Sequence, residues 1–386
     1  MSKQSSQKSK KKPQDSICEA TVRYEKWLSQ YVNLEKSQLK HKYVEMMDDP
    51  FSFLRATFYR WVQLWDHHAA NLHDAPKVLG VGDLHLENFG TWRDVEGRLV
   101  WGVNDFDEAA LMPFTVDLVR LCASAIIAIS NTDALAASRE KACEVILDGY
   151  ASTMLAYVKT GPNTAKPIVL AENNPWLLEI ASAQLKDPES FWSKLIALPK
   201  IENKNVPKDV VAHIDELMPY AAPEPISWKN RVAGLGSLGR PRYLALSTWN
   251  GGHVAREAKA LAPTTWHWQT ETEDPELTFY REILERAVRS PDPFVSQRQN
   301  WIIRRLAPDC VKIRLEKLPK EYEYDLLRAM GRETANIHLG SPRSAPAIIE
   351  YLKKQPKDWL INAGATMAEA TVRDFDEWCA DHKCKA

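Results

Sequence analysis

Hydrophobic and polar positions repeat with two different periods along this chain. From residue 17 to 75, and again from Val116 to about Tyr157, apolar residues recur every three to four positions, which is typical of helices with one buried face. From Ile226 to about Lys259 they alternate instead, and "NGG" interrupts the run with a strong hairpin signal. The pattern therefore predicts helices first, a meander of three strands second, and helices again toward the C-terminus.

Shorter apolar runs predict further strands. The runs at 77–83 ("KVLGVGD") and 97–107 ("GRLVWGVNDFD") are rich in β-branched residues and bounded by Gly and Asp, and a polar connection lies between them. After the meander we expect a helix over 275–288, a strand over 300–307 and one more over 310–318. Together these elements indicate an α+β fold.

Composition narrows the function classes. The 386 residues carry a formal net charge of −1, so the basic excess of a nucleic-acid-binding protein is missing. No run approaches the roughly 18 apolar residues of a membrane span, and the N-terminus lacks the apolar core of a secretory signal. Six scattered cysteines do not form a disulfide framework. We therefore expect a cytoplasmic protein with free thiols and with neither nucleic-acid nor membrane partners, and its oligomeric state stays open.

Polar side chains follow two apolar runs in close succession. "GDLHLEN" places Asp83 five residues before Asn88, and "NDFDEA" places Asp105 and Asp107 directly after the next strand. This spacing is that of a phosphoryl-transfer site, in which the first Asp takes a proton from the acceptor hydroxyl while the Asn and the later Asp converge on Mg²⁺. Taken singly, each of these residues is more often a turn former. Taken together they predict Asn88, Asp105 and Asp107 as metal ligands.

A glycine-rich segment lies within the predicted meander. Gly234, Gly236 and Gly239 form a GxGxxG pattern that also contains Ser237, and an alternating strand follows it rather than a helix. A dinucleotide-binding turn requires a helix at that point, whereas a loop that covers ATP phosphates joins two strands. The segment alone also fits an ordinary glycine hairpin, so its interpretation as a nucleotide-binding loop depends on the other motifs.

The strand after this loop offers two cations for the phosphates. Arg256 and Lys259 are three residues apart and therefore face opposite sides of a regular strand. Arg256 shares a face with Val254, and Lys259 is the chemically usual choice, so the sequence does not separate them. Glu282 or Glu285 on the predicted helix could pair with the chosen cation.

Several of these motifs together resemble a known family. The stretches "PFSFLRATF", "GDLHLENFG", "NDFDEA", "PFTVDLVRLCAS", "VAGLGSLG" and "IHLGS" are similar to the bacterial domain-of-unknown-function 2252 family, over most of residues 45–345. That family is regarded as a remote relative of aminoglycoside phosphotransferases and protein kinases. The resemblance implies Asp83 as catalytic base, His85 as support for its loop, and Asp117 as the buried carboxylate that anchors the loop backbone. Where many members carry Lys-Glu-Ala, this chain has Arg256-Glu257-Ala258.

The order of the motifs is unusual for such a fold. In ordinary kinases the glycine loop and the cation strand precede the catalytic loop, whereas here they follow it by about 150 residues. We therefore expect a circularly permuted, two-lobed, protein-kinase-like fold. Its predicted parts are a disordered basic tail (1–16), a helical catalytic lobe (17–224), a β-rich nucleotide lobe (225–310), and connecting and C-terminal helices (311–386).

These observations predict an ATP- and Mg²⁺-dependent phosphotransferase acting on a hydroxyl of a small molecule or protein. A nucleotide-binding module without turnover and an enzyme that transfers AMP are the alternatives. Arg55 and Arg120 lie in apolar patterns, so we expect each of them to pair with a carboxylate.

Overall fold

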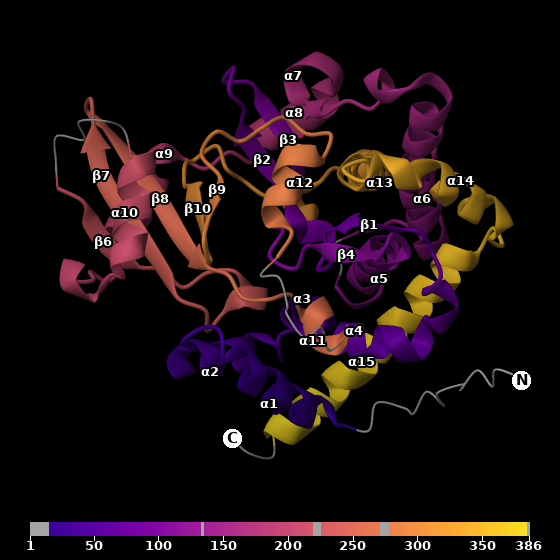
Figure 1. The fold of residues 1–386 in the computed structure, drawn as a ribbon, viewed down its shortest axis with the longest axis horizontal. Helices are drawn as coiled ribbons and strands as arrows, with labels where there is room; N and C mark the ends of the chain where they lie inside the picture. Colours follow the sequence, from indigo (N-terminus) through magenta and orange to yellow (C-terminus); the bar gives the residue numbers. More distant parts are fainter. Residues whose placement is uncertain (1–14, 133–134, 219–224, 271–277, 384–386) are drawn as a thin grey trace, which may run out of the picture.

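The computed structural model describes residues 15–132, 135–218, 225–270 and 278–383. They fold into helices and three small antiparallel sheets, which is the predicted α+β class. Figure 1 shows the largest sheet at one side of the molecule and the long helices at the other. The first four helices are α1 (Ile17–Leu28), α2 (Lys36–Glu45), α3 (Pro50–Ala56) and α4 (Phe58–His68). Ser16 caps α1, and most of the predicted tail, residues 1–14, lies outside the described residues.

The helical part is built around α5 (Thr115–Asn131), which is buried along most of its length. The helices packed around it belong to the same hydrophobic core and are α6 (Arg139–Thr160), α13 (Glu323–His338), α14 (Ala345–Lys354) and α15 (Trp359–Lys383). A disulfide joins Cys122 of α5 to Cys143 of α6. This bond corrects the expectation of free thiols, because residues distant in sequence meet where the two helices pack.

Two small sheets lie between the helical part and the larger sheet. β1 (Lys77–Gly80) pairs with β4 (Ala110–Pro113), and β3 (Leu99–Val103) lies between β2 (Phe89–Arg93) and β5 (Ile168–Val169). The strands predicted within 77–83 and 97–107 are thus confirmed as β1 and β3. β2 lies partly in the predicted polar connection, and its Thr91 N–H donates to the Val311 carbonyl at 2.8 Å. This tertiary contact helps to hold β2 in place.

The larger sheet has the strand order β6-β7-β8-β10-β9. Its strands are β6 (Ser227–Asn230), β7 (Arg242–Trp249), β8 (Gly252–Ala260), β9 (Ser296–Arg298) and β10 (Trp301–Arg305). The predicted meander and the strand over 300–307 are confirmed, and Asn250 and Gly251 both have the positive φ that a tight hairpin needs. The strand predicted over 310–318 is wrong, because this segment makes only a single bridge, Gly90 to Lys312, and a short 3₁₀ turn.

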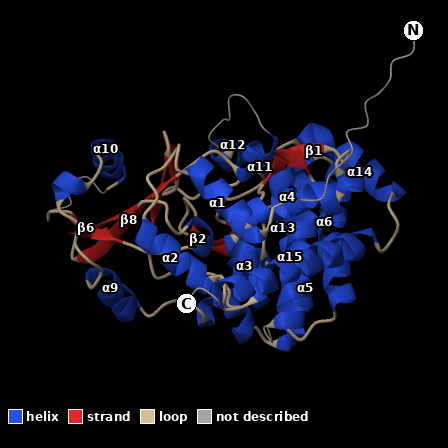
Figure 2. Cartoon of the chain, turned by 90° about the horizontal axis from the view of Figure 1, so that it is seen from below, coloured by secondary structure: helices blue, strands red, loops and turns tan. Residues whose placement is uncertain are grey.

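Two helices cover opposite faces of this sheet, as Figure 2 shows. α9 (Pro188–Ile196) contributes Leu195 to an apolar cluster with Leu244 of β7, and α10 (Lys208–Leu217) contributes Val210 and Ile214 to a cluster that includes Ala258 of β8. Both helices, which precede residue 225, thus find their apolar partners in the larger sheet. The remaining helices are α7 (Leu170–Asn173), α8 (Pro175–Ala183), α11 (Thr265–Thr270) and α12 (Tyr280–Arg286). Of the helix predicted over 275–288, residues 275–277 lie outside the described part.

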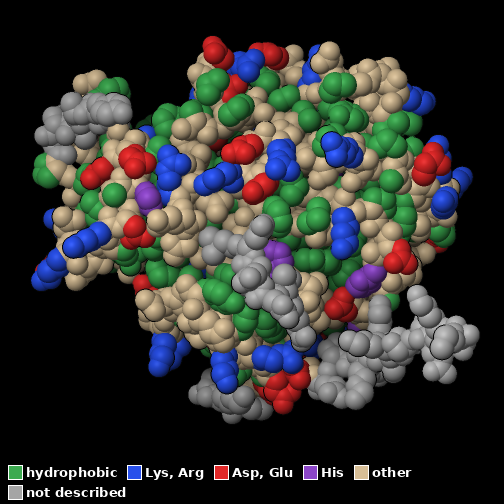
Figure 3. Space-filling model, in the orientation of Figure 1, with side chains coloured by type: hydrophobic (Ala, Val, Ile, Leu, Met, Phe, Trp, Pro, Cys, Tyr) green, Lys and Arg blue, Asp and Glu red, His purple; other side chains and the backbone are tan. Residues whose placement is uncertain are grey.

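The molecular surface mixes both signs of charge. Figure 3 shows basic and acidic side chains close together over β9, β10 and α12, which agrees with a net charge of −1. Among the described residues, no helix combines the length and apolar character that crossing a membrane requires.

Candidate functional site

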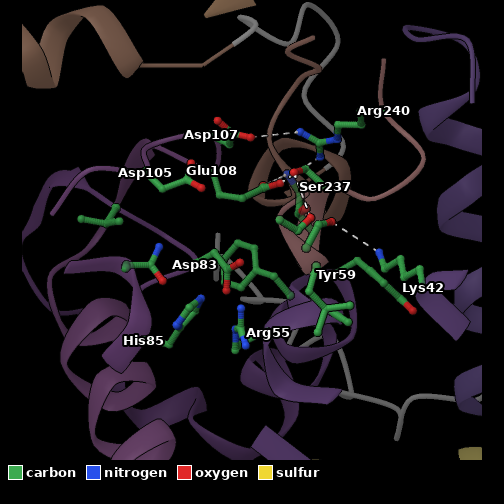
Figure 4. Close-up of a pocket in the computed structure, with 18 of the residues that line it drawn as sticks. Lys42, Arg55, Tyr59, Asp83, His85, Asp105, Asp107, Glu108, Ser237 and Arg240 are labelled. Carbon is green, nitrogen blue, oxygen red and sulfur yellow. Dashed lines mark hydrogen bonds and ion pairs between the residues drawn. The ribbon is translucent and has the colours of Figure 1, made fainter. Parts of the chain in front are cut away.

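Most of the predicted site residues line one cavity of about 70 Å³ between the larger sheet and the helical part. Figure 4 shows it in close-up, with His85 and Arg55 near Asp83 and with Asp105, Asp107 and Glu108 on the opposite side. The predicted residues that line it are Asp83, His85, Asn88, Asp105, Asp107, Gly234, Gly236, Ser237 and Lys259. Residues about 150 positions apart in the sequence therefore share one enclosure.

Asp83 lies just after β1, with a buried arginine against its carboxylate. The Nε of Arg120 donates to Asp83 Oδ1 at 2.9 Å, and the guanidinium lies over the rings of Phe58 and Trp61. Burial raises the pKa of Asp83, and the Arg120 charge opposes this without cancelling it. The other oxygen, Oδ2, faces the glycine loop, since a Cβ on Gly236 would lie 3.5 Å from it. Arg120 thus meets a carboxylate, as expected, and leaves one oxygen of Asp83 toward the cavity.

Asp117 does not line the cavity, but it holds the backbone that leads from β1 into Asp83. Its carboxylate accepts hydrogen bonds from the Val81 N–H at 2.7 Å and the Gly82 N–H at 2.8 Å. His338, at the end of α13, bonds to the same carboxylate through Nε2 at 2.8 Å, and its Nδ1 bonds to the Tyr150 hydroxyl. All of these side chains are buried. Asp117 is therefore a positioning residue that sets the backbone immediately before Asp83.

His85 supports the short 3₁₀ turn that contains Asn88. Its Nδ1 accepts a hydrogen bond from the Glu87 N–H at 3.2 Å. Burial lowers the pKa of His85 well below its usual range, and the nearby Arg55 charge lowers it further. The imidazole is therefore neutral near pH 7. Arg55 in turn pairs with Glu87 at 3.0 Å, so it also finds the expected carboxylate.

The carboxylates after β3 meet the ammonium group of Lys259. Lys259 Nζ lies 3.3 Å from Asp105 Oδ1, and it also pairs with Asp107. Burial opposes ionisation of Asp105, but the charges of Lys259, Arg304 and Arg242 together outweigh it, so the pKa of Asp105 falls below its usual range. The pKa of Asp107 rises, because it is buried and lies beside the Asp105 charge. This pair of carboxylates therefore carries at least one negative charge at neutral pH.

Two buried oxygens in this group have no hydrogen-bond partner among the described residues, namely Asn88 Oδ1 and Asp107 Oδ1. Orphaned acceptors of this kind in a cavity suit a cation or ordered water. No three carboxylate, imidazole or thiol groups in the described part of the chain come together as a metal site. A divalent cation here would thus depend on two carboxylates, an amide oxygen and ligands from the substrate, which is the usual environment of Mg²⁺.

The structure separates the two cations of β8. Lys259 lies in the site, whereas Arg256 projects from the opposite face, where its Nε donates to the Leu217 carbonyl at 3.1 Å. Arg256 therefore lies outside the cavity that Lys259 lines, and the alternation of side chains along the strand is the reason. The carboxylates that Lys259 contacts are Asp105 and Asp107 rather than Glu282 or Glu285 of α12.

The glycine loop, residues 234–239, lines the cavity with its first four residues. Gly234 and Gly239 have positive φ, and residues 235–237 form a 3₁₀ turn. A Cβ on Gly236 would lie 2.9 Å from the Arg55 carbonyl, which is tighter than ordinary packing allows. Gly239 packs on Leu39 of α2 instead and does not line the cavity. Gly236 is thus the member of the motif that approaches Asp83.

Gly234→Ala is expected to destabilise the protein more than Gly97→Ala. Both positions have positive φ, which costs an L-residue about 1–2 kcal/mol, but a Cβ on Gly234 also meets Arg242 at 2.8 Å, whereas one on Gly97 meets nothing within 4 Å. Chemical denaturation of both variants measures the difference, with Gly97→Ala reporting the backbone effect alone. Equal losses of unfolding free energy would contradict a tightly packed loop.

Lys42, Glu108 and Arg240 are among the further residues that line the cavity, and the sequence alone did not indicate them as site residues. Lys42 of α2 is buried, and its Nζ lies 3.4 Å from the Gly236 carbonyl; burial lowers its pKa to about 8. Arg240 bonds to Glu108 at 3.3 Å and lies 3.7 Å from Asp107. Lys42 lies in an ordinary polar helix pattern, so no local signal identifies it. Arg240 directly follows the glycine motif, and a positive charge next to a predicted phosphate-binding loop is the sequence feature that could have identified it.

Glu333 of α13 supports β3 just before the carboxylates. It is buried, and its Oε1 accepts from the Val103 N–H at 3.3 Å. Burial raises the pKa of Glu333 to about 7, against the opposing effect of Arg289. The native state thus holds this proton more tightly than the unfolded state does. The contribution of Glu333 to the free energy of unfolding is fully present below about pH 4.5. About 3 kcal/mol of it is lost as the pH rises to about 7.

Glu333→Gln is therefore expected to flatten the fall in stability between pH 5 and pH 8. At pH 8 the variant avoids a buried charge and should unfold with a free energy about 1–2 kcal/mol above wild type. Denaturation at the two pH values measures this, and Glu350→Gln, at an exposed pair with Lys353, is the control. Parallel profiles for wild type and Glu333→Gln would contradict the raised pKa.

Comparison with known proteins gives a match to one family model over part of the chain, and no activity. Residues 34–204 match the model of the family described as "Uncharacterized protein conserved in bacteria (DUF2252)". The resemblance stated from the motifs is thus confirmed for this segment, which contains every site residue from Asp83 to Asp117 and ends before the glycine loop. No curated protein and no solved structure matches the chain.

Proposed function

We propose that this protein, whose residues 34–204 match a bacterial family described without an activity, is an ATP- and Mg²⁺-dependent phosphotransferase with a permuted, protein-kinase-like fold. The observation that carries the proposal is the single cavity shared by Asp83, Asn88, Asp105, Gly236 and Lys259. A proton acceptor, an amide oxygen, a carboxylate, a phosphate-covering backbone and a cation are the parts that phosphoryl transfer requires.

The residues present fit a magnesium ion. The unpartnered Asn88 Oδ1 and Asp107 Oδ1, with the half-exposed Asp105 beside them, supply oxygen ligands that prefer hard cations. Bound there with a nucleotide, Mg²⁺ would neutralise charge on the transferred phosphoryl group. In this proposal Lys259, which now contacts both carboxylates, turns toward the nucleotide phosphates.

Asp83 is the proposed proton acceptor for the attacking hydroxyl. Oδ2 faces the cavity while Oδ1 is held by Arg120, so the carboxylate is fixed in one orientation. Its raised pKa makes it a stronger base than an exposed carboxylate. The Asp117 contacts with the Val81 and Gly82 N–H groups keep its backbone from shifting during the reaction.

The cavity has to enlarge before a nucleotide can bind. Its volume of about 70 Å³ is far below the roughly 300–1,000 Å³ of pockets that enclose small-molecule ligands. The glycine loop occupies the space, and the contact between Lys42 Nζ and the Gly236 carbonyl holds it near Asp83. Nucleotide binding in this proposal therefore lifts the loop and exchanges that carbonyl contact for phosphate contacts.

The position of α13 supports a circular permutation. Although α13 follows the catalytic loop by more than 230 residues, its terminal His338 contacts Asp117, and Ser341 Oγ accepts from the Leu79 N–H at 2.9 Å. The end of α13 therefore adjoins the strand that leads into Asp83. This is the neighbour relation expected if an ancestral chain ran from that helix directly into the loop.

Transfer of label from ATP to a cellular metabolite pool tests the proposal. With Mg²⁺, γ-labelled ATP should label an acceptor and α-labelled ATP should not, and Asp105→Asn should remove the signal. Label from α-labelled ATP would instead indicate AMP transfer. Nucleotide-induced thermal stabilisation without transfer of either label would indicate a non-catalytic binding module, and the absence of all three signals would overturn every nucleotide-based function.

A further inference from the structure

Three arginines surround one buried glutamate on the sheet face above the site. Glu257 of β8 is fully buried, and its Oε1 accepts from Arg242 at 2.9 Å and from Arg304 at 2.7 Å, while Arg231 pairs with its other oxygen. Burial opposes ionisation of Glu257, yet the three guanidinium charges lower its pKa well below the usual range. The glutamate is thus a fixed anion that orients all three cations.

This cluster has more positive charge than its carboxylate can balance. Three guanidinium groups share the single carboxylate of Glu257, which leaves two positive charges among these four residues, with Asp105 and Asp107 as the next carboxylates that act on Arg304 and Arg242. Arg231 and Arg304 keep about a quarter of their side chains exposed, at 25% and 27%, so they can reach a ligand. The positive charge of Arg231 and Arg304 also reaches Lys186. Burial is the main cause of the lowered pKa of Lys186, and these two arginines lower it further. The excess is local, because the chain as a whole is nearly neutral.

The cluster adjoins the proposed transfer site. Glu257 and Lys259 lie on the same face of β8, about 7 Å apart along the strand. Arg242 donates to Ser237 Oγ in the glycine loop, and the charge of Arg304 acts on Asp105. A ligand that reaches from Asp105 past the glycine loop would therefore meet Arg304 and Arg231 next.

We propose that Arg231 and Arg304, oriented by the buried Glu257, form a phosphate-binding subsite beside Asp105. Guanidinium groups bind phosphate oxygens through paired N–H donors, and a phosphate dianion would balance the two excess charges. The phosphate belongs either to the nucleotide or to a phosphorylated acceptor. This inference rests on the proposed function for its place in a reaction, but the binding itself is independent of turnover.

Calorimetric titration of the full chain with sodium tripolyphosphate, without Mg²⁺ and at low salt, tests the subsite. Arg231→Gln and Arg304→Gln should each weaken binding about tenfold, the effect of losing one charged hydrogen-bonding pair. Arg298→Gln, on β9 with Glu216 as its partner, is the matched control and should bind as wild type does. Unchanged affinity in both subsite variants, with their folding verified by circular dichroism, would overturn the proposal.

A conservative variant keeps the test decisive if Arg304→Gln does not fold. Arg304→Lys retains a cation beside Glu257 but loses the paired donors, so it should fold and still bind several times more weakly. Wild-type affinity in Arg304→Lys and in a folded Arg231→Gln would overturn the proposal equally.

Competition identifies the source of the phosphate. If ATP displaces tripolyphosphate, the subsite holds the nucleotide chain, and if both bind together, it holds a phosphate on the acceptor. Arginine-dependent tripolyphosphate binding without any label transfer would support the subsite and contradict the proposed function. Label transfer that is lost in Asp105→Asn but unaffected in the arginine variants would support the proposed function and contradict the subsite.

Discussion

Asp105→Asn is expected to reduce phosphoryl transfer by about a thousandfold while leaving the fold intact. The substitution keeps the shape of the side chain but removes the charge that the proposed function assigns to metal binding, and losses of this size follow removal of one essential group. The Asp105 side chain is 42% exposed, so no buried charge is stranded on the protein, and Lys259 retains Asp107. Initial rates with γ-labelled ATP and Mg²⁺ measure the effect.

The matched control for this variant is Asp309→Asn. Asp309 is also a partly exposed aspartate that pairs with arginines, Arg93 and Arg305, but it does not line the cavity. It should retain nearly full activity. A loss of less than tenfold in Asp105→Asn, with the thermal unfolding temperature unchanged, would remove Asp105 from the metal-binding role.

Asp117→Asn is expected to lower the free energy of unfolding by about 3–5 kcal/mol, the range for breaking a buried charged network. The carboxylate accepts from two backbone N–H groups and from His338, with both of its oxygens engaged. An asparagine has one acceptor oxygen, so at least one buried N–H is left facing another donor. Denaturant unfolding monitored by tryptophan fluorescence measures the loss.

A second measurement separates positioning from mere stabilisation in this variant. Below the unfolding temperature, Asp117→Asn should also lose activity, because the loop before Asp83 is no longer held at Val81 and Gly82. Asp148→Asn, at an exposed pair with Arg328, should change stability by less than about 1 kcal/mol and leave activity unchanged. Full activity of folded Asp117→Asn would show that the loop keeps its geometry without this anchor.

The local features of the candidate site could be predicted from the sequence because they depend on neighbouring residues. Asp83 and Asn88 lie in one short loop between β1 and β2, so their spacing alone places both near the same strand ends. The hairpin at Asn250 and Gly251 follows from turn chemistry that only residues tolerant of positive φ satisfy. The glycine motif could be assigned to a strand–loop–strand unit because the alternation continues after it.

Features that depend on distant contacts could not be predicted in this way. The Cys122–Cys143 disulfide, the packing of α9 and α10 on the sheet, and the burial of Lys42 beneath Gly236 all depend on which surfaces meet. The arginine cluster draws its members from three separate strands or strand ends, and its shared partner, Glu257, carries no local sign of burial. Composition and periodicity contain no information on such pairings.

The sequence by itself determined the α+β class, the meander with its glycine loop, and the polar groups that follow two strands. Only the tertiary structure decided between Arg256 and Lys259, because the pairing of β8 with β7 and β10 fixes which face of the strand turns toward Asp105. It also brought Asp83 and Gly236 into one cavity across about 150 residues of chain. The physical reason is that turn and strand preferences act between neighbours, whereas the burial of apolar faces brings the two parts of the molecule together.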